Sequence, residues 1–208
     1  ARTHQPYLQG FRGVLLATEI CVMVTGFTYL GLVESLAIFS SYTLIVAAMS
    51  GPILGEIVGW RRWMAIFAGL CGVLIILKPG MGVFSVYAII PLIAASMFAL
   101  YSLLTRYVAR QDSTATSFFW TGVTGCIVMT FVGMFHLEDM IPADWLLMLC
   151  LCFTGATGHW LLIRCYEVAE ASAVQPFTYL QLVFGAAIGV MVFGEVIETN
   201  VAVGAVLV

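Results

Sequence analysis

Two ionisable side chains lie inside long apolar stretches, where they could bind a charged solute or carry a proton. Glu19 follows Arg12 by seven residues, and His159 precedes Arg164 by five. In a helix these spacings correspond to about 10 Å and about 8 Å. If both arginines mark the same membrane surface, Glu19 and His159 share a depth and could pair, bind a charged substrate together, or take up and release a proton.

A structural role for Glu19 and His159 remains the alternative. An ionisable group at bilayer depth costs at least about 2.5–3 kcal/mol, so each side chain should face a cavity or a partner. Glu19 could pair with Arg12 or with a neighbouring helix, and His159 could make a hydrogen bond that only fixes packing.

Tyr179 and Gln181 are further candidates for lining a solute pathway. Both follow Pro176, and proline opens the helical hydrogen-bond ladder and frees a carbonyl. A polar pair beside such a kink could contact a solute. The alternative is that the two side chains make hydrogen bonds between helices.

Glu56 and Glu195 each follow a glycine at the end of an apolar stretch. A carboxylate at a helix C-terminus is disfavoured by the helix dipole, so capping does not explain them. Their recurrence predicts a shared role, such as bonding to the start of the next helix or forming a gate. An ordinary interfacial charge is the alternative.

Enzymatic, metal and nucleic-acid chemistry are not indicated. The aspartates Asp112, Asp139 and Asp144 fall in loops, which excludes an intramembrane aspartyl protease, and there is no His-Glu-x-x-His motif. The six cysteines lie in apolar segments and behave as small hydrophobes. No basic cluster or glycine-rich phosphate loop is present. The sequence therefore predicts no catalytic residues, no metal, no cofactor and no nucleic-acid partner.

The elements that must position these residues are transmembrane helices. Of the 208 residues 62% are hydrophobic and 9% are charged, against about a quarter charged in a soluble domain. Five uncharged runs approach or exceed the roughly 18–20 residues of a membrane-spanning helix. They are apolar on both parities, which excludes β-strands. We therefore predict an all-α integral membrane protein in the lipid bilayer. Its helices span roughly 11–32, 34–54, 63–78, 84–107, 116–136, 144–168, 171–194 and 200 onward.

Basic residues predict the orientation of these helices. When the sides of the membrane are assigned by crossing parity, Lys78 stands alone on one side. The seven arginines fall on the side where the first helix begins: Arg2, Arg12, Arg61, Arg62, Arg106, Arg110 and Arg164. Basic residues stay in the cytoplasm, so that side is predicted to be cytoplasmic. The acidic loop around 138–144 is then external.

An internal repeat is also indicated. Residues 33–38 followed by Gly55-Glu56 resemble residues 169–174 followed by Gly194-Glu195, with Glu34 set opposite Glu170. The spacer between the two parts is shorter in the first copy than in the second. Crossing parity gives the copies opposite orientation, and inverted repeats with a site at their interface are typical of transporters.

Several short segments carry a resemblance to a known family. They are Gly55–Trp63, Gly69–Gly80, Gly158–Leu162, Gln175–Gln181 and Phe193–Glu195. In this order they resemble the EamA-type transporters of the drug/metabolite transporter superfamily.

The resemblance implies ten helices in two inverted five-helix repeats with cytoplasmic termini. Residues 1–80 would supply the last three helices of the first repeat, and residues 81–208 the second repeat, truncated in its last helix. The chain would then lack the first two helices, and we expect it not to transport by itself. Family members move amino acids, other metabolites, nucleotide derivatives or drugs.

The predicted function is therefore secondary transport of a small metabolite or drug-like solute by alternating access, with a coupling proton or ion as a candidate partner. A membrane channel or a non-transporting membrane scaffold is the alternative, and an enzyme is not expected. The predicted location is the bacterial plasma (inner) membrane.

Overall fold

A computed structural model describes residues 3–56, 59–60, 63–64, 67–68, 71–72, 75, 86–135, 140–178, 180–196, 199 and 202–203. Helices, turns and short loops make up these residues, and no strand occurs among them, which confirms the all-α class. Within the described residues, six helical stretches are long and apolar enough to cross a membrane. They are Pro6–Leu30, Leu32–Leu54, Val86–Val108, Thr114–Gly133, Pro142–Val168 and Ala171–Phe193.

These six stretches match six of the predicted helices to within five residues at each end. The predicted helices at 63–78 and from 200 onward fall largely outside the described residues. The chain divides into two compact units. The first unit contains residues 1–17 and 104–169, and the second contains residues 18–103 and 170–208.

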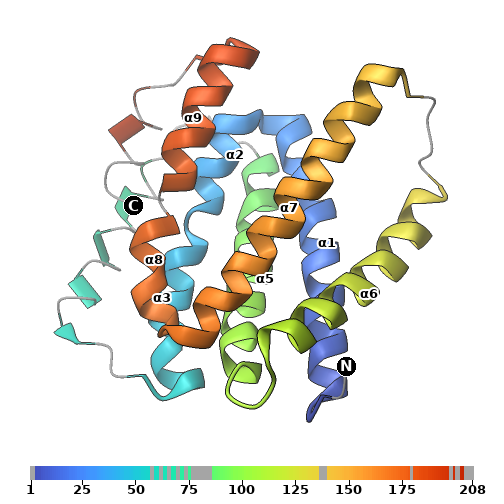
Figure 1. Ribbon diagram of the computed structural model, residues 1–208. Coiled ribbons are helices and arrows are strands. Elements are labelled where there is room, and N and C mark those ends of the chain that lie inside the picture. The colour runs from blue at the N-terminus through green and yellow to red at the C-terminus, as the bar shows by residue number, and fades with distance from the viewer. Residues whose placement is uncertain are drawn as a thin grey trace. The chain divides into compact units, whose positions relative to one another are not determined.

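The second unit is built around two helical stretches. One consists of α2 (Leu32–Phe39) and α3 (Tyr42–Leu54), and the other contains α8 (Ala171–Thr178) and α9 (Leu180–Phe193). α2 packs against α9 and α3 packs against α8, so the two stretches lie antiparallel and side by side (Figure 1).

The break between α2 and α3 comes from two serines with helical dihedral angles but tighter hydrogen bonds. The N–H of Ser41 donates to the carbonyl of Ile38, and the N–H of Thr43 donates to the carbonyl of Ser40, both three residues back. The hydroxyl of Ser40 also donates to the carbonyl of Ala37 at 2.6 Å. Such local side-chain bonds compete with the regular helical ladder and favour a short 3₁₀ turn.

An aromatic cluster holds this break in place. Phe39 and Tyr42, on either side of the serines, pack against Phe98 of α5 (Ile89–Val108) with ring centroids 5.5 and 4.8 Å away. Tyr101 extends the cluster along α5, with its ring centroid 5.7 Å from that of Phe98. Tyr42 and Tyr101 are buried, so the cluster fixes the middle of the α2–α3 stretch against α5.

The first unit contains the start of α1 (Pro6–Leu30), the end of α5, α6 (Thr114–Gly133) and α7 (Pro142–Val168). The Ser113 hydroxyl accepts a bond from the backbone N–H of Thr116 and caps the start of α6. α1 approaches α6 closely at Gly13, where a Cβ atom would lie 1.7 Å from the Thr124 hydroxyl oxygen. Glycine is therefore required at that contact.

Candidate functional site

The end of α9 binds the start of α2. Gly194 (φ 65°) lets the chain leave α9 in the left-handed region, and Glu195 follows. The Glu195 carboxylate accepts hydrogen bonds from the backbone N–H groups of Leu32 at 2.7 Å and Val33 at 2.8 Å. The first N–H groups of a helix lack partners within it and carry its positive dipole end. A single carboxylate thus satisfies two of them, and we call this contact the Glu195 cap.

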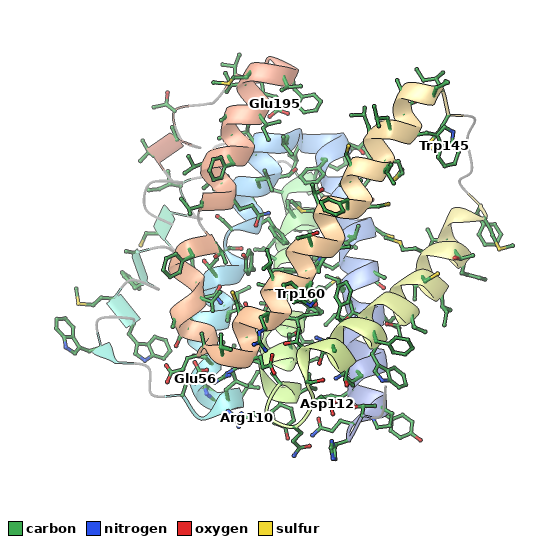
Figure 2. All side chains as sticks on the ribbon, viewed as in Figure 1. Glu56, Arg110, Asp112, Trp145, Trp160 and Glu195 are labelled. Atoms are coloured by element: carbon green, nitrogen blue, oxygen red, sulfur yellow. The ribbon has the colours of Figure 1, made fainter. Side chains whose placement is uncertain are left out.

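The end of α3 binds the start of α8 in the same way. Gly55 has φ 71°, and the carboxylate of Glu56 accepts hydrogen bonds from the N–H groups of Ala171 at 3.0 Å and Ser172 at 3.3 Å. We call this contact the Glu56 cap. Figure 2 shows Glu56 and Glu195 at opposite ends of the two paired helical stretches.

One constant spacing relates the two caps. Glu56 and Glu195 are separated in the sequence by the same interval as Leu32 and Ala171. The ends of α3 at Leu54 and of α9 at Phe193 have the same separation. The start of each helical stretch and its cap carboxylate are thus separated by the same number of residues.

The predicted alignment set Glu34 opposite Glu170, whereas the spacing of the two caps sets Leu32 opposite Ala171, three residues out of step with that alignment. The unequal spacers of the two copies are the sign of this difference. At the helix starts the cap uses backbone N–H groups, so the side chains of Leu32 and Ala171 need not be alike and a sequence alignment finds no match there.

Glycine allows α9 to approach α2 closely. A Cβ atom at Gly185 would lie 2.2 Å from the Leu36 side chain, and one at Gly189 would lie 2.4 Å from the Val33 side chain. No ordinary Cβ contact is that short. The two glycines, one turn apart on α9, therefore form the surface against which α2 packs.

These contacts correct the prediction for Glu56 and Glu195. Capping does explain the two carboxylates, because each caps a helix distant in sequence rather than the helix that it follows. Among the described residues, both carboxylates bond to the start of a helix that is distant in sequence. Their role as gates stays a prediction.

A buried arginine organises the first unit. Arg12 is fully buried, and its guanidinium donates to the Gln9 side-chain oxygen at 2.8 Å and to the Thr105 hydroxyl at 3.1 Å. It also donates to the Ser117 carbonyl at 2.7 Å and to the Thr121 hydroxyl at 2.8 Å. This network joins α1 to α5 and α6.

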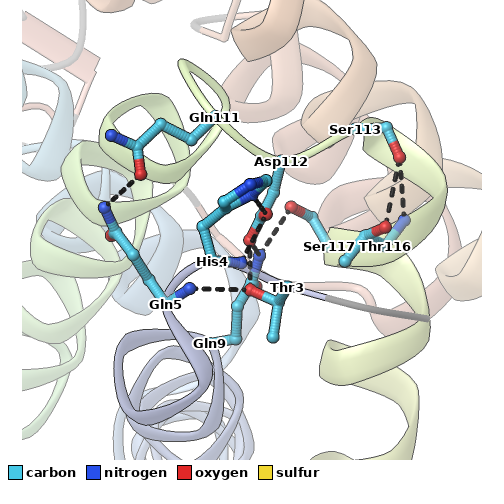
Figure 3. Close-up of polar contacts among 9 residues, drawn as sticks. All are labelled: Thr3, His4, Gln5, Gln9, Gln111, Asp112, Ser113, Thr116 and Ser117. Carbon is cyan, nitrogen blue, oxygen red and sulfur yellow. Dashed lines mark hydrogen bonds and ion pairs between the residues drawn. The ribbon is translucent and has the colours of Figure 1, made fainter.

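Gln9 extends the network to Asp112, in the short segment between α5 and α6. Its amide donates to a carboxylate oxygen of Asp112 at 2.9 Å. Asp112 also accepts from the Thr3 hydroxyl and from the backbone N–H of His4 (Figure 3). Burial raises the pKa of the Asp112 carboxyl, but the hydrogen bonds from Gln9, Thr3 and His4 outweigh it and hold the pKa below its ordinary value.

The end of α7 lies beside the end of α5 in this unit. Arg106 donates to the carbonyl of Tyr166 at 2.9 Å, which satisfies a carbonyl in the last turn of α7. Arg164 pairs with Glu167 at 2.5 Å in the same turn. The start of α1 and the ends of α5 and α7 thus bring arginines to one end of the first unit. Sequence reasoning missed the burial of Arg12, which it used only as a marker of the membrane surface.

The sequence model of the EamA-like transporter family matches residues 85–208, which is more than half of the chain. The chain belongs to this family. It is also similar to a riboflavin transporter of Vibrio cholerae, with 29% identity over 84% of this chain and 59% of that protein. An S-adenosylmethionine uptake transporter of Rickettsia prowazekii is 23% identical over 100% of this chain and 70% of its own length. A pseudopaline exporter of Pseudomonas aeruginosa is 23% identical over 95% of this chain and 70% of its own length.

The chain of this EamA-like protein therefore spans about 59–70% of the length of these relatives. One of these relatives is named as an uptake transporter and another as an exporter. The relatives thus share a class of activity, while their solutes differ in chemistry.

The other predicted site residues are distributed as follows. Glu19 is buried in α1, with 4% of its surface exposed, and Gln181 is exposed at the start of α9. Tyr179 lies outside the described residues. His159 is half-buried in α7. Glu19 belongs to the second unit and His159 to the first, so their pairing stays a prediction.

Proposed function

We propose that this chain forms part of a secondary transporter that moves a small metabolite or drug-like solute across a membrane by alternating access between two inverted repeats. The observation that carries the proposal is the reciprocal capping of two antiparallel helical stretches at one constant spacing. Inverted repeats with a site at their interface are typical of secondary transporters. Membership of the EamA-like family supports the same class.

The proposed architecture is the ten-helix fold with two five-helix repeats. Residues 1–80 belong to the first repeat and residues 81–208 to the second, and the protein resides in the plasma membrane of a bacterium. The arginines at one end of the first unit support a cytoplasmic position for that end. Cysteine labelling from outside intact cells tests the orientation: position 140 should react and position 61 should not.

Flux into vesicles tests the transport activity itself. The full-length natural protein that contains this chain is reconstituted and challenged with riboflavin, S-adenosylmethionine and a panel of labelled metabolites. Saturable uptake with counterflow supports a carrier. Flux that does not saturate indicates a channel, and no flux for any solute indicates a scaffold; either result overturns the proposal.

Glu19 and His159 are the proposed coupling residues, with Gln181 and Tyr179 as candidates for solute contact. The burial of Glu19 in an apolar helix supports a special role for this carboxylate. We expect Glu19→Gln and His159→Ala to be expressed normally and to transport slowly or with a shifted pH profile. Normal transport by both variants, or loss of folded protein in both, favours a structural role.

A further inference from the structure

The Glu195 and Glu56 caps exist together at opposite ends of one pair of antiparallel helical stretches. We infer that Glu56 and Glu195 are positioning residues that hold α2, α3, α8 and α9 together as one body throughout the transport cycle, rather than gates that open in turn. The inference rests on the proposed transport function. Gates that alternate are never both intact while a cavity faces either side, whereas contacts within a single body stay intact in every state.

The partners of the two carboxylates favour a permanent contact. Both caps use backbone N–H groups at a helix start, and the residues that supply them include Ala171 and Val33, which are buried. Opening a cap would break two hydrogen bonds of a half-buried carboxylate and remove the acceptor from two N–H groups at a helix start. A working gate instead needs contacts that water or a solute can replace at little cost.

The packing between the caps also resists separation. Val33 and Leu36 of α2 lie against Gly189 and Gly185 of α9, at distances that leave no room for a Cβ atom on α9 while the facing side chains keep their present shape. Sliding α2 along α9 by one turn would bring a larger residue, Leu182 or Phe193, onto this face, because residues three or four apart share a helix face. α3 and α8 are in contact over the other half of the body. A pair that is capped at both ends and packed along its length cannot open at one end alone.

A disulfide between α2 and α9 tests whether the two helices separate during transport. Val33→Cys and Gly189→Cys are introduced together into the full-length natural protein after replacement of its other cysteines by alanine. The close approach of position 189 to the Val33 side chain suits a disulfide. We expect the oxidised protein to retain transport within about twofold of the reduced protein, because no relative movement of α2 and α9 is needed. Transport that stops on oxidation and returns on reduction overturns the inference.

Hydrogen exchange provides a readout that does not depend on flux. In lipid nanodiscs the amides of residues 32–33 and 171–172 should stay protected both without solute and with riboflavin. Glu195→Gln should speed exchange at 32–33 by at least about tenfold while 171–172 stay protected, and Glu56→Gln should do the reverse. Glu195→Asp should restore part of the protection.

Fast exchange at one cap of the unmodified protein, with slow exchange at the other, contradicts the inference. A parent protein that carries no solute at all overturns the proposed function, whereas the exchange pattern still decides whether the caps open.

Discussion

The two caps use the same chemistry on surfaces that pack differently. The carboxylate–amide distances are 2.7 and 2.8 Å in the Glu195 cap and 3.0 and 3.3 Å in the Glu56 cap. Beside the Glu195 cap, the contact consists of glycines of α9 against aliphatic side chains of α2. At the corresponding positions of the other pair, α3 supplies Val46 and Ser50 instead of glycines, and α8 supplies Ser172 and Gln175 instead of aliphatic residues.

The polar residues beside the Glu56 cap are buried as well. Ser50 is fully buried, and Ser172 and Gln175 are nearly so. The Gln175 amide donates to the carbonyl of Ala171 at 2.9 Å, and the Ser50 hydroxyl donates to the carbonyl of Ala47 at 3.0 Å. The comparison teaches that the two caps keep the same hydrogen-bond geometry while the packing beside them varies. The backbone N–H groups must point at a carboxylate in both caps, whereas either apolar or polar side chains can fill the space beside them.

Removal of a cap carboxylate should have the largest effect. Glu195→Ala removes the acceptor of two part-buried N–H groups, which should cost about 1–3 kcal/mol for each group. Glu56→Ala should cost less, since its bonds are longer. The comparison is made by unfolding each variant in mixed detergent micelles. A greater loss of stability in Glu56→Ala would show that the carboxylate–amide distance does not determine which cap stabilises the protein more.

Exchange of the small residues between the two contacts should have the next largest effect. Gly189→Ser places a Cβ atom 2.4 Å from the Val33 side chain, so we expect a loss of about 1–3 kcal/mol from overpacking. Ser50→Gly removes atoms without a clash and should cost about 0.5–1 kcal/mol. Gly155→Ser is a matched control, because no atom lies within 4 Å of the added Cβ. Equal losses in the first two variants would mean that the two contacts are packed alike.

Acidification should reduce the stability of the parent protein, with its carboxylate at Asp112 in the first unit, more than that of a variant with a neutral residue there. The pKa of Asp112 is lowered in the folded protein, so its stabilising contribution is complete above the ordinary carboxyl pKa of about 3.9 and is lost as the pH falls through the lowered value. The unfolding temperature of the parent should therefore fall more steeply below about pH 4 than that of Asp112→Asn. Parallel pH profiles would contradict this assignment.

The smallest effect is expected from a carboxylate that caps its own helix in an exposed position. Asp144 accepts from the backbone N–H of Ile141 at 3.3 Å at the start of α7. Water replaces it readily, so Asp144→Asn should leave the unfolding temperature unchanged within measurement error. A loss of stability as large as that of Glu195→Ala would show that the strength of a cap depends neither on its burial nor on whether it joins two helices distant in sequence.

Much of the fold follows from the sequence because bilayer length and apolar runs determine helices almost alone. The stretch predicted at 171–194 is Ala171–Phe193 in the structure, and the one predicted at 34–54 is Leu32–Leu54. The serine break at 40–41 was missed because a short 3₁₀ turn keeps the apolar character of the run. Arg12 was misjudged because its partners come from α5 and α6, far away in sequence.

The candidate site was less accessible to sequence reasoning. The paired Gly-Glu motifs pointed to Glu56 and Glu195 as a pair. Their partners could not be found by residue type in the sequence, because they are backbone N–H groups, which every residue except proline carries. An ungapped alignment run backwards from the two motifs would have reached Leu32 and Ala171. No such pattern connects Glu19 with His159, since each is a single residue in an apolar helix.

The constant spacing also limits how the gene can vary. Glu56 follows Leu32 at the same interval in the sequence as Glu195 follows Ala171. Inserting one residue in a helix turns everything after it by about 100° and advances it by about 1.5 Å. An insertion in α3 would carry Glu56 away from α8, and only a matching insertion in α9 would keep the two helical stretches equal in length. Segments 32–56 and 171–195 should therefore gain or lose residues together, because a hydrogen-bonded cap joins them at each end.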